Sequence, residues 1–116
     1  MRARSAGQAR LHADIHRLLS LLMQREVADP RLQHVTITRV EPAAGGQLLI
    51  LWVHRAEDDD RRSCIRRLNR LLPHFSHELR RALPKRRLPE LEFRWDEAVD
   101  DGDRVLHLLR SIEGDA

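Results

Sequence analysis

Apolar side chains recur along the first quarter of the chain with the period of an α-helix. They lie on one stripe, formed by Leu11, Ile15, Leu18, Leu19 and Leu22. A stripe at this spacing predicts an amphipathic helix over about residues 6–27 that buries one side. The helix should end before Pro30, because the residue that precedes a proline is driven out of the helical region.

The spacing then changes to the alternation that is typical of β-strands. Residues 35–40 alternate and are rich in β-branched side chains, and residues 48–53 form a second strand-like run. The residues from Pro42 to Gly46 favour a turn, so the two strands should pair as an antiparallel hairpin. Trp52 lies in a strand that is apolar on both faces. Its ring can therefore belong to the core, to a platform on which bases stack, or to a partner surface.

Helical spacing returns in the middle of the chain and is interrupted by a proline. The acidic residues 57–60 suit the start of a helix. One face of this helix is apolar and contains Ile65, Leu68, Leu71 and Leu72. Pro73 cannot donate a backbone N–H and disfavours helix at the residue before it, so the helix must break or kink there. Pro73 also suits the first position of a new helix, whose apolar face contains Phe75, Leu79, Ala82 and Leu83.

A strand and a helix complete the predicted fold. After a basic loop over residues 84–88, apolar and charged side chains alternate over residues 91–95, which predicts a half-buried strand. Acidic residues within 100–103 then start a last helix. Its apolar residues are expected to face inward: Val105, Leu108, Leu109 and Ile112. The order α-β-β-α-kink-α-β-α indicates an α+β fold, a three-stranded sheet with helices on one face.

The length of 116 residues suits one domain. We expect this domain to span residues 1–116, with frayed ends at residues 1–5 and 113–116. No stretch is apolar enough to cross a membrane and no apolar leader follows the first arginines, so we expect a cytoplasmic protein. Cys64 is the only cysteine, which excludes a disulfide within the chain and a zinc site made of several cysteines.

Positive charge is concentrated in one third of the chain. Residues 61–94 carry a net charge of +8, whereas residues 95–116 carry −5. This asymmetry favours a polyanionic partner, because each phosphate that is neutralised releases counterions. Arginine-rich helices can also be ordinary solvated surfaces, so charge alone does not decide between the two. The sparse aromatic residues argue against a sheet that stacks bases in the manner of an RRM domain.

Arginines form a ridge on the predicted helix before Pro73. Arg62, Arg66 and Arg70 lie four residues apart, opposite the apolar face, and Arg67 flanks them. Guanidinium groups pair bidentately with phosphates and stack on bases, which suits folded RNA. The candidate RNA-binding residues continue into the next helix and the basic loop: Arg62, Arg66, Arg67, Arg70, Arg80, Arg81, Lys85, Arg86 and Arg87.

The other reactive side chains favour structural roles. His12 and His16 have the spacing of metal ligands on a helix, but no glutamate stands between them as metalloprotease chemistry needs. His74 and His77 fall on an outer helix face, where polar contacts or pH-dependent charge near an anion are expected. Cys64 lies inside an amphipathic helix, and no serine lies in a nucleophile elbow. We therefore expect neither enzymatic activity nor a metal or cofactor.

The local motifs resemble those of the ribosome-binding factor A family. Asp-Pro-Arg-Leu at residues 29–32, followed by Val-Thr-Ile-Thr-Arg-Val-Glu at residues 35–41, is similar to the family signature after its first helix. Leu-Trp-Val at residues 51–53 fits its second strand, in which tyrosine is the usual middle residue. Arg-Arg-Leu-Pro-Glu-Leu-Glu-Phe at residues 86–93 is similar to its most recognisable block. The resemblance implies a type II KH-like domain.

The sequence departs from the family at the interhelical kink. The family usually has Ala-x-Gly there, and this chain has Leu71, Leu72 and Pro73. Proline preserves a break but removes an N–H donor and the close approach that glycine permits. An arginine that commonly follows is Ser76 in this chain. The expected RNA contact therefore moves from the kink to the flanking arginines.

The resemblance implies a non-enzymatic assembly factor that binds the immature small (30S) ribosomal subunit and its 16S rRNA. It further implies help with maturation of the rRNA 5′ end and a role in growth at low temperature. We expect the protein to act as a monomer, without a small-molecule substrate. The alternative is a KH-like protein-interaction module whose basic face meets an acidic protein or its own acidic C-terminal segment. A DNA-associated protein is a weaker alternative, since no helix-turn-helix recognition helix is evident.

Overall fold

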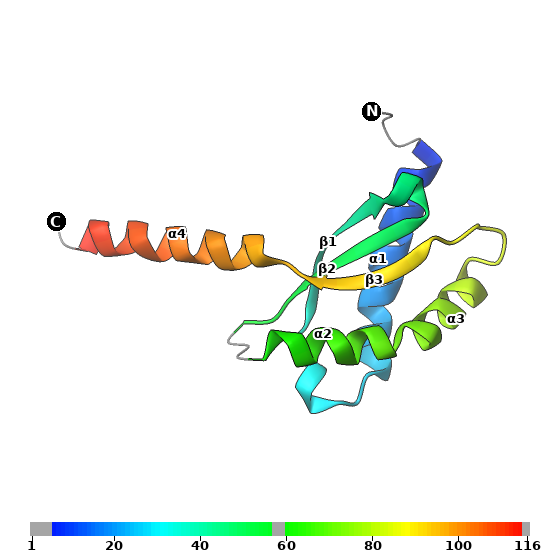
Figure 1. Cartoon of the computed structure of the whole chain (residues 1–116), viewed down its shortest axis with the longest axis horizontal. Helices are drawn as coiled ribbons and strands as arrows, with labels where there is room; N and C mark the ends of the chain where they lie inside the picture. The colour runs from blue at the N-terminus through cyan, green and yellow to red at the C-terminus, as the bar shows by residue number, and fades with distance from the viewer. Residues whose placement is uncertain (1–5, 57–59, 115–116) are drawn as a thin grey trace.

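The computed structural model describes residues 6–56 and 60–114, in which helices pack against a three-stranded sheet (Figure 1). The main elements are α1 (Ala6–Glu26), β1 (Thr36–Ala43), β2 (Leu48–His54), α2 (Arg61–Arg70), α3 (Leu72–Ala82), β3 (Glu90–Trp95) and α4 (Glu97–Gly114). Single 3₁₀ turns, η1 (Pro30–Leu32) and η2 (Ala44–Gly46), flank β1. The predicted order is confirmed. The predictions for residues 1–5, 57–59 and 115–116 lie outside the described residues.

The sheet has the order β1-β2-β3 and mixed strand directions. β1 and β2 pair antiparallel, as predicted for the hairpin, whereas β2 and β3 are parallel, with Leu51 opposite Phe93. The register of β1 shifts between Ile37 and Arg39. The Thr38 hydroxyl at this irregularity donates a hydrogen bond to the Asp96 carboxylate at 2.5 Å and lies 3.3 Å from the Trp52 carbonyl oxygen. The bulge therefore links β1 to the chain that follows β3.

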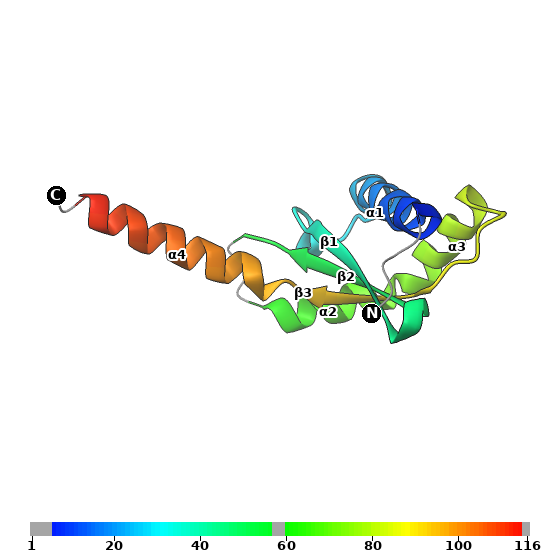
Figure 2. The ribbon, with the colours of Figure 1, turned by 90° about the horizontal axis from the view of Figure 1, so that it is seen from above.

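The hydrophobic core lies between one face of the sheet and the helices α1, α2 and α3 (Figure 2). Its largest fully buried side chains are Ile15, Leu19, Leu49, Leu51, Val53, Leu68, Phe75, Leu79 and Phe93. The rings of Phe75 and Phe93 meet edge to face, with their centroids 6.1 Å apart. The prediction of a sheet with these helices on one face is confirmed. Trp95 also contributes, since its partly buried side chain packs against this core.

Trp52 lies outside the helix-side core. It is only partly buried and is absent from the core cluster, while the alternate strand residues Leu51 and Val53 are fully buried in that cluster. The Arg39 guanidinium lies over the Trp52 ring, 4.5 Å from its centroid. Because strand side chains alternate between faces, the Trp52 ring belongs to the face of the sheet opposite the helices.

The predicted helix break is present, but the second helix begins at Leu72, one residue before the proline that was expected to start it. α2 ends at Arg70, α3 begins at Leu72, and Pro73 occupies the first turn of α3. The Leu71 N–H donates to the Leu68 carbonyl oxygen at 3.0 Å, and the Leu71 carbonyl oxygen accepts from the Phe75 N–H at 3.0 Å. The two helices thus share Leu71 as their junction, and the missing proline N–H falls where a first helical turn needs none.

The last helix departs from the prediction. The apolar residues of α4 were expected to face inward, but Val105, Leu108, Leu109 and Ile112 are between 53% and 69% exposed. α4 runs away from the sheet and the other helices (Figures 1 and 2). Helical spacing correctly predicts an apolar stripe, but it does not specify which surface lies near enough to cover that stripe. The three preceding helices already cover the helix-side face of the sheet.

Asn69 connects α2 to the outer edge of β3. Its side-chain amide donates to the Phe93 carbonyl oxygen at 3.3 Å, and its side-chain oxygen accepts from the Phe93 N–H at 2.9 Å. Both groups belong to the same residue of an edge strand. Backbone groups of this kind must find a partner when they are shielded from water. Asn69 supplies both partners and sets the position of α2 along the strand.

We expect Asn69→Leu to lower the free energy of unfolding by about 2 kcal/mol, because it leaves the N–H and C=O of Phe93 without their partners. Urea unfolding followed by circular dichroism measures this loss. Arg66→Leu, on the exposed face of the same helix, is the control and should change stability by less than about 0.5 kcal/mol. Equal stability of the two variants would contradict the role assigned to Asn69.

Candidate nucleic-acid interface

Three arginines of α2 form an exposed row. Asp60 caps the helix by accepting a hydrogen bond from the Ser63 N–H at 3.2 Å, and Cys64 and Leu68 are buried against the core. Arg62, Arg66 and Arg70 are exposed; because they lie four residues apart, they share a helix face. We call these three residues the α2 ridge. Within residues 6–56 and 60–114, no carboxylate lies within 4 Å of their guanidinium groups.

Arg67 differs from the ridge because its side chain is held within the protein. It is 29% exposed, its guanidinium lies 3.6 Å from the Asp29 carboxylate, and it donates a hydrogen bond to the Ser63 hydroxyl at 3.2 Å. The pKa of Asp29 lies below its usual value, mainly because of hydrogen bonds from the side chain and backbone of Arg31, with a smaller contribution from the Arg67 charge. Arg67 therefore connects α2 to η1 beside the ridge.

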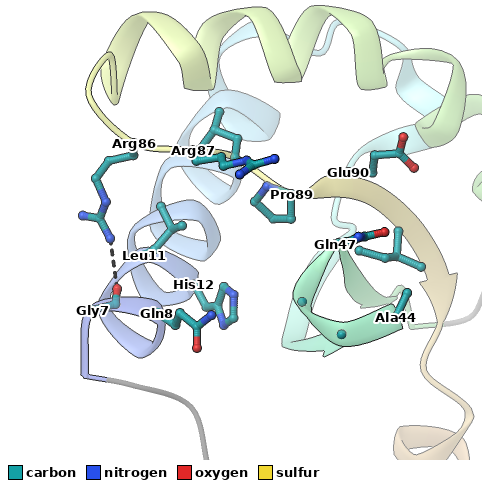
Figure 3. A pocket seen from close by; sticks show the side chains of 14 residues that line it. Gly7, Gln8, Leu11, His12, Ala44, Gln47, Arg86, Arg87, Pro89 and Glu90 are labelled. Carbon is teal, nitrogen blue, oxygen red and sulfur yellow. Dashed lines mark hydrogen bonds between the residues drawn. The ribbon is translucent and has the colours of Figure 1, made fainter.

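The remaining predicted residues lie on α3 and in the loop before β3. Arg80, Arg81, Lys85 and Arg87 are exposed. Arg81 forms an ion pair with Glu78 at 3.4 Å on its own helix. Arg86 is partly buried and donates a hydrogen bond to the Gly7 carbonyl oxygen at 2.9 Å (Figure 3). The elements that carry these residues, α2, α3 and the loop before β3, follow one another along one side of the ribbon (Figure 1).

The kink lies beside a small hollow of about 260 Å³ between α1, η1 and the two helices. Arg67, Arg70, Leu71 and His74 contribute to its lining. The His74 ring is 2.6 Å from the Glu26 carboxylate, which joins the start of α3 to the end of α1. Leu71 and Leu72 are half-buried and Pro73 is exposed. The kink residues themselves therefore offer carbon atoms. The charged side chains that line the hollow are Arg67, Arg70, Glu26 and Asp29.

The histidines with metal-ligand spacing have other surroundings. His16 Nε2 lies 2.9 Å from the Ile37 carbonyl oxygen, and His12 is buried. No group of three or more His, Cys, Asp or Glu side chains that could hold a metal ion occurs among residues 6–56 and 60–114. In the same part of the chain, no helix is both long and apolar enough to cross a membrane.

The sequence patterns did not predict a polar cluster at the base of α4. Asp100 accepts hydrogen bonds from His54 at 2.7 Å and from the Trp95 indole at 3.0 Å, and these contacts lower the pKa of its carboxyl group, His54 contributing most. Asp96 is buried and caps the first turn of α4 by accepting from the Ala98 N–H at 3.1 Å. The sequence places acidic residues at the start of the last helix, but it does not indicate that one of them, Asp100, contacts His54 of β2. This cluster fixes the direction in which α4 leaves the body.

The order of elements, the mixed sheet and the exposed α2 ridge define an α+β domain of the KH-like class with a cationic helix pair. The chain belongs to the ribosome-binding factor A family, whose model matches residues 7–109. It is similar to ribosome-binding factor A of Geobacter metallireducens, with 32% identity over 99 residues that cover 84% of each chain. It is also 30% identical to that of Brevibacillus brevis over 105 residues, which cover 90% of this chain and 87% of the relative.

Solved structures agree with this assignment. The crystal structure of ribosome-binding factor A from Thermus thermophilus has a TM-score of 0.66 and 31% identity, and the match covers 77% of this chain and 94% of that one. A homology model of the Thermus thermophilus protein, fitted into a cryo-EM map of a complex with the 30S subunit, has a TM-score of 0.62 and 32% identity. That match covers 78% of this chain and 96% of the other. The expected KH-like fold is confirmed.

Proposed function

We propose that this protein binds the immature small ribosomal subunit through its 16S rRNA and assists the maturation of that subunit. The α2 ridge carries the proposal. It presents three guanidinium groups in one row, and no described carboxylate neutralises them. Guanidinium groups pair strongly with phosphates. The family relationship and the 30S complex of the similar Thermus thermophilus protein support the choice of ribosomal RNA as the polyanion.

The proposed mechanism is electrostatic positioning. The α2 ridge docks on phosphates of one rRNA segment, and the rigid connection of α2 to β3 through Asn69 keeps the arginines in place. The bound segment is held in one conformation while the 5′ end of the rRNA is processed. Alternative RNA pairings persist longer in the cold, so this help would matter most for growth at low temperature. No bond is made or broken by the protein itself, which acts as a non-enzymatic factor without a cofactor.

The proline kink changes the expected contact with RNA. Pro73 offers neither an N–H donor nor the free backbone of a glycine. Of the basic residues that line the adjacent hollow, Arg67 contacts Asp29 and His74 contacts Glu26, so Arg70 is the guanidinium that supplies charge and donors in its place. We therefore place the RNA contact on the nine basic residues predicted from the sequence, with the α2 ridge at its centre and Leu71, Leu72 and Pro73 as a spacer.

One copy of the chain suffices for this function, because every residue of the proposed interface belongs to one sequential path along α2, α3 and the loop. We propose a monomer that acts in the cytoplasm, where immature subunits are found. The acidic C-terminal segment does not compete for the ridge in this arrangement, since α4 runs away from the body (Figure 1). This geometry disfavours the alternative in which the basic face binds the protein's own acidic segment.

Salt dependence tests the proposal. Between about 50 and 200 mM salt, we expect the affinity of the protein for purified small subunits to fall at least roughly 20- to 40-fold, the loss that the three phosphate contacts of the α2 ridge alone require. Co-sedimentation of the protein with the subunits at the two salt concentrations measures the change. The absence of binding to small subunits and to purified 16S rRNA at low salt would overturn the proposal. Binding that does not respond to salt would point to a protein partner instead.

A further inference from the structure

Within residues 6–56 and 60–114, the large apolar side chains that are exposed all lie on one helix, α4. They are between 47% and 69% exposed and comprise Val105, Leu106, Leu108, Leu109 and Ile112. The helix leaves the end of β3 and extends away from the sheet and the other helices (Figure 1). Single exposed apolar residues are common on proteins, but a contiguous group of them marks an interaction surface.

Four of these side chains form a stripe on α4. Residues three, four and seven apart share a helix face, and this spacing connects Val105, Leu108, Leu109 and Ile112. Asp101 lies one turn before Val105 and Glu113 lies one turn after Leu109, so each end of the stripe has a carboxylate. We call these six residues the α4 stripe. Leu106 lies on the opposite side of the helix from Leu108, because two residues advance a helix by about 200°.

The first turn of α4 holds the helix and leaves the stripe open. Asp100 accepts hydrogen bonds from His54 at 2.7 Å and from the Trp95 indole at 3.0 Å. Glu97 pairs with Arg61 of α2 at 3.4 Å. Beyond these contacts, every residue from 101 to 113 is exposed. The rest of the described chain therefore fixes the start of α4 without covering its apolar face.

An uncovered helix of this kind lacks the usual source of helical stability. In proteins, most of that stability comes from packing an apolar face against other elements. Gly102, in the interior of α4, weakens the helix further, because a glycine loses more conformational freedom on folding than any other residue. A partner that covers the α4 stripe would supply the missing packing.

The charge of α4 restricts what can cover the stripe. The helix contains five carboxylates and two guanidinium groups, a net charge of −3. Asp101 pairs with Arg104 at 3.7 Å, whereas no cation among the described residues lies within 4 Å of the Glu113 carboxylate. Phosphates would be repelled by this helix, and a second α4 would bring like charges together. A basic segment with an apolar face of its own complements both properties of the stripe.

We propose that the α4 stripe docks a basic amphipathic helix of a ribosomal protein in the small subunit. The apolar side chains of that helix would pack on Leu108, Leu109 and Ile112. Its lysines or arginines would pair with Asp101 and Glu113. Helices bind one another through apolar residues at this spacing. The inference rests on the proposed function and adds a protein contact to the RNA contact of the α2 ridge.

The two contacts have opposite charge and lie on different helices. The α2 ridge is cationic and needs only RNA, whereas the α4 stripe is anionic and needs a protein that has already joined the subunit. The factor would therefore bind subunits that contain this protein more tightly than it binds bare 16S rRNA. Because the ridge and the stripe share no residue, each contact can be weakened without the other.

Two leucines of α4 provide a matched pair of variants. Leu108→Ser removes a side chain from the centre of the stripe, and Leu106→Ser makes the same change on the opposite side of the helix, with the same effect on helix propensity. We expect Leu108→Ser to weaken binding to purified small subunits about tenfold, the size of one well-packed interface residue. Its affinity for protein-free 16S rRNA should not change. Leu106→Ser should stay within about twofold of the unchanged protein in both assays.

Two acidic residues test the charge of the partner. Glu113→Lys reverses the charge at the end of the stripe, and Asp103→Lys does so on the side of α4 that faces away from it. A basic protein partner predicts that Glu113→Lys weakens binding to small subunits about threefold and more than Asp103→Lys does. If RNA covered the stripe, Glu113→Lys would instead strengthen binding, because the new cation would neutralise a phosphate.

Equal affinities of Leu108→Ser and Leu106→Ser for small subunits would overturn the docking surface, and so would a gain of affinity in Glu113→Lys. A photocrosslinker in place of Glu113 should attach to a ribosomal protein of net positive charge. Attachment only to rRNA, or to a second copy of the chain, would also overturn the inference. Failure of the unchanged protein to bind both small subunits and 16S rRNA at low salt would instead remove the proposed function itself.

Discussion

Replacing Arg62, Arg66 and Arg70 with glutamate is expected to lower the affinity for small ribosomal subunits by at least about 100-fold, or ~2.8 kcal/mol. Each replacement removes a guanidinium that can pair with a phosphate and adds a charge that repels it. The three residues are exposed and have no carboxylate partner within the described residues. Their replacement should therefore weaken RNA binding without disturbing the fold. Co-sedimentation with purified subunits at low salt measures the loss.

A second triple variant separates a local effect from the change in net charge. Arg17, Arg104 and Arg110 are also exposed, and they lie on α1 and α4. Their replacement with glutamate alters the net charge by the same amount and should lower the affinity by less than about tenfold, since distant charges are screened. Glutamate is nearly as good a helix former as arginine, so circular dichroism should show both variants folded. Equal losses in the two triples would contradict a localised interface.

Phe75→Ala is expected to have the largest effect on stability, a loss of about 3–5 kcal/mol in the free energy of unfolding. Phe75 is fully buried on α3, and its ring meets Phe93 of β3 edge to face. The substitution removes this aromatic contact and leaves a cavity where α3 and the sheet meet. For a domain of this size, the midpoint of thermal unfolding should fall by more than about 10 °C.

Leu109→Ala is the matched control, because it also shortens an apolar side chain on a helix. Leu109 is 53% exposed on α4, so its truncation should change the free energy of unfolding by less than about 0.5 kcal/mol. Thermal unfolding followed by circular dichroism compares the two variants. A loss at Leu109 similar to the loss at Phe75 would show that α4 is packed against the body in solution.

Most helices and strands could be predicted from the sequence because their positions depend on residues that are close together in the chain. The stripe through Leu11 and Ile15, the alternation before Pro42 and the break at Pro73 each have a cause within a few residues. The direction of β3 and the position of α4 have no such local cause. α4 is placed by contacts of Asp100 with His54, which lies 46 residues earlier in the chain.

The sequence predicted the positive charge of the candidate interface and its exposed arginine face, but not the contacts that hold individual arginines. Helical spacing placed Arg62, Arg66 and Arg70 on one exposed face, because a face opposite Leu68 must point to solvent. The same reasoning could not show that Arg67 is held by Asp29 or that Arg86 reaches Gly7. Those partners are distant in sequence and are brought near only by tertiary packing.

The side chain of Asn69 occupies the place that a fourth strand would take beside Phe93. An incoming peptide that lies along β3 finds the donor and acceptor of this residue already engaged. Extended segments of other proteins therefore cannot form the ladder of backbone hydrogen bonds at Phe93 that adding a strand to this edge requires.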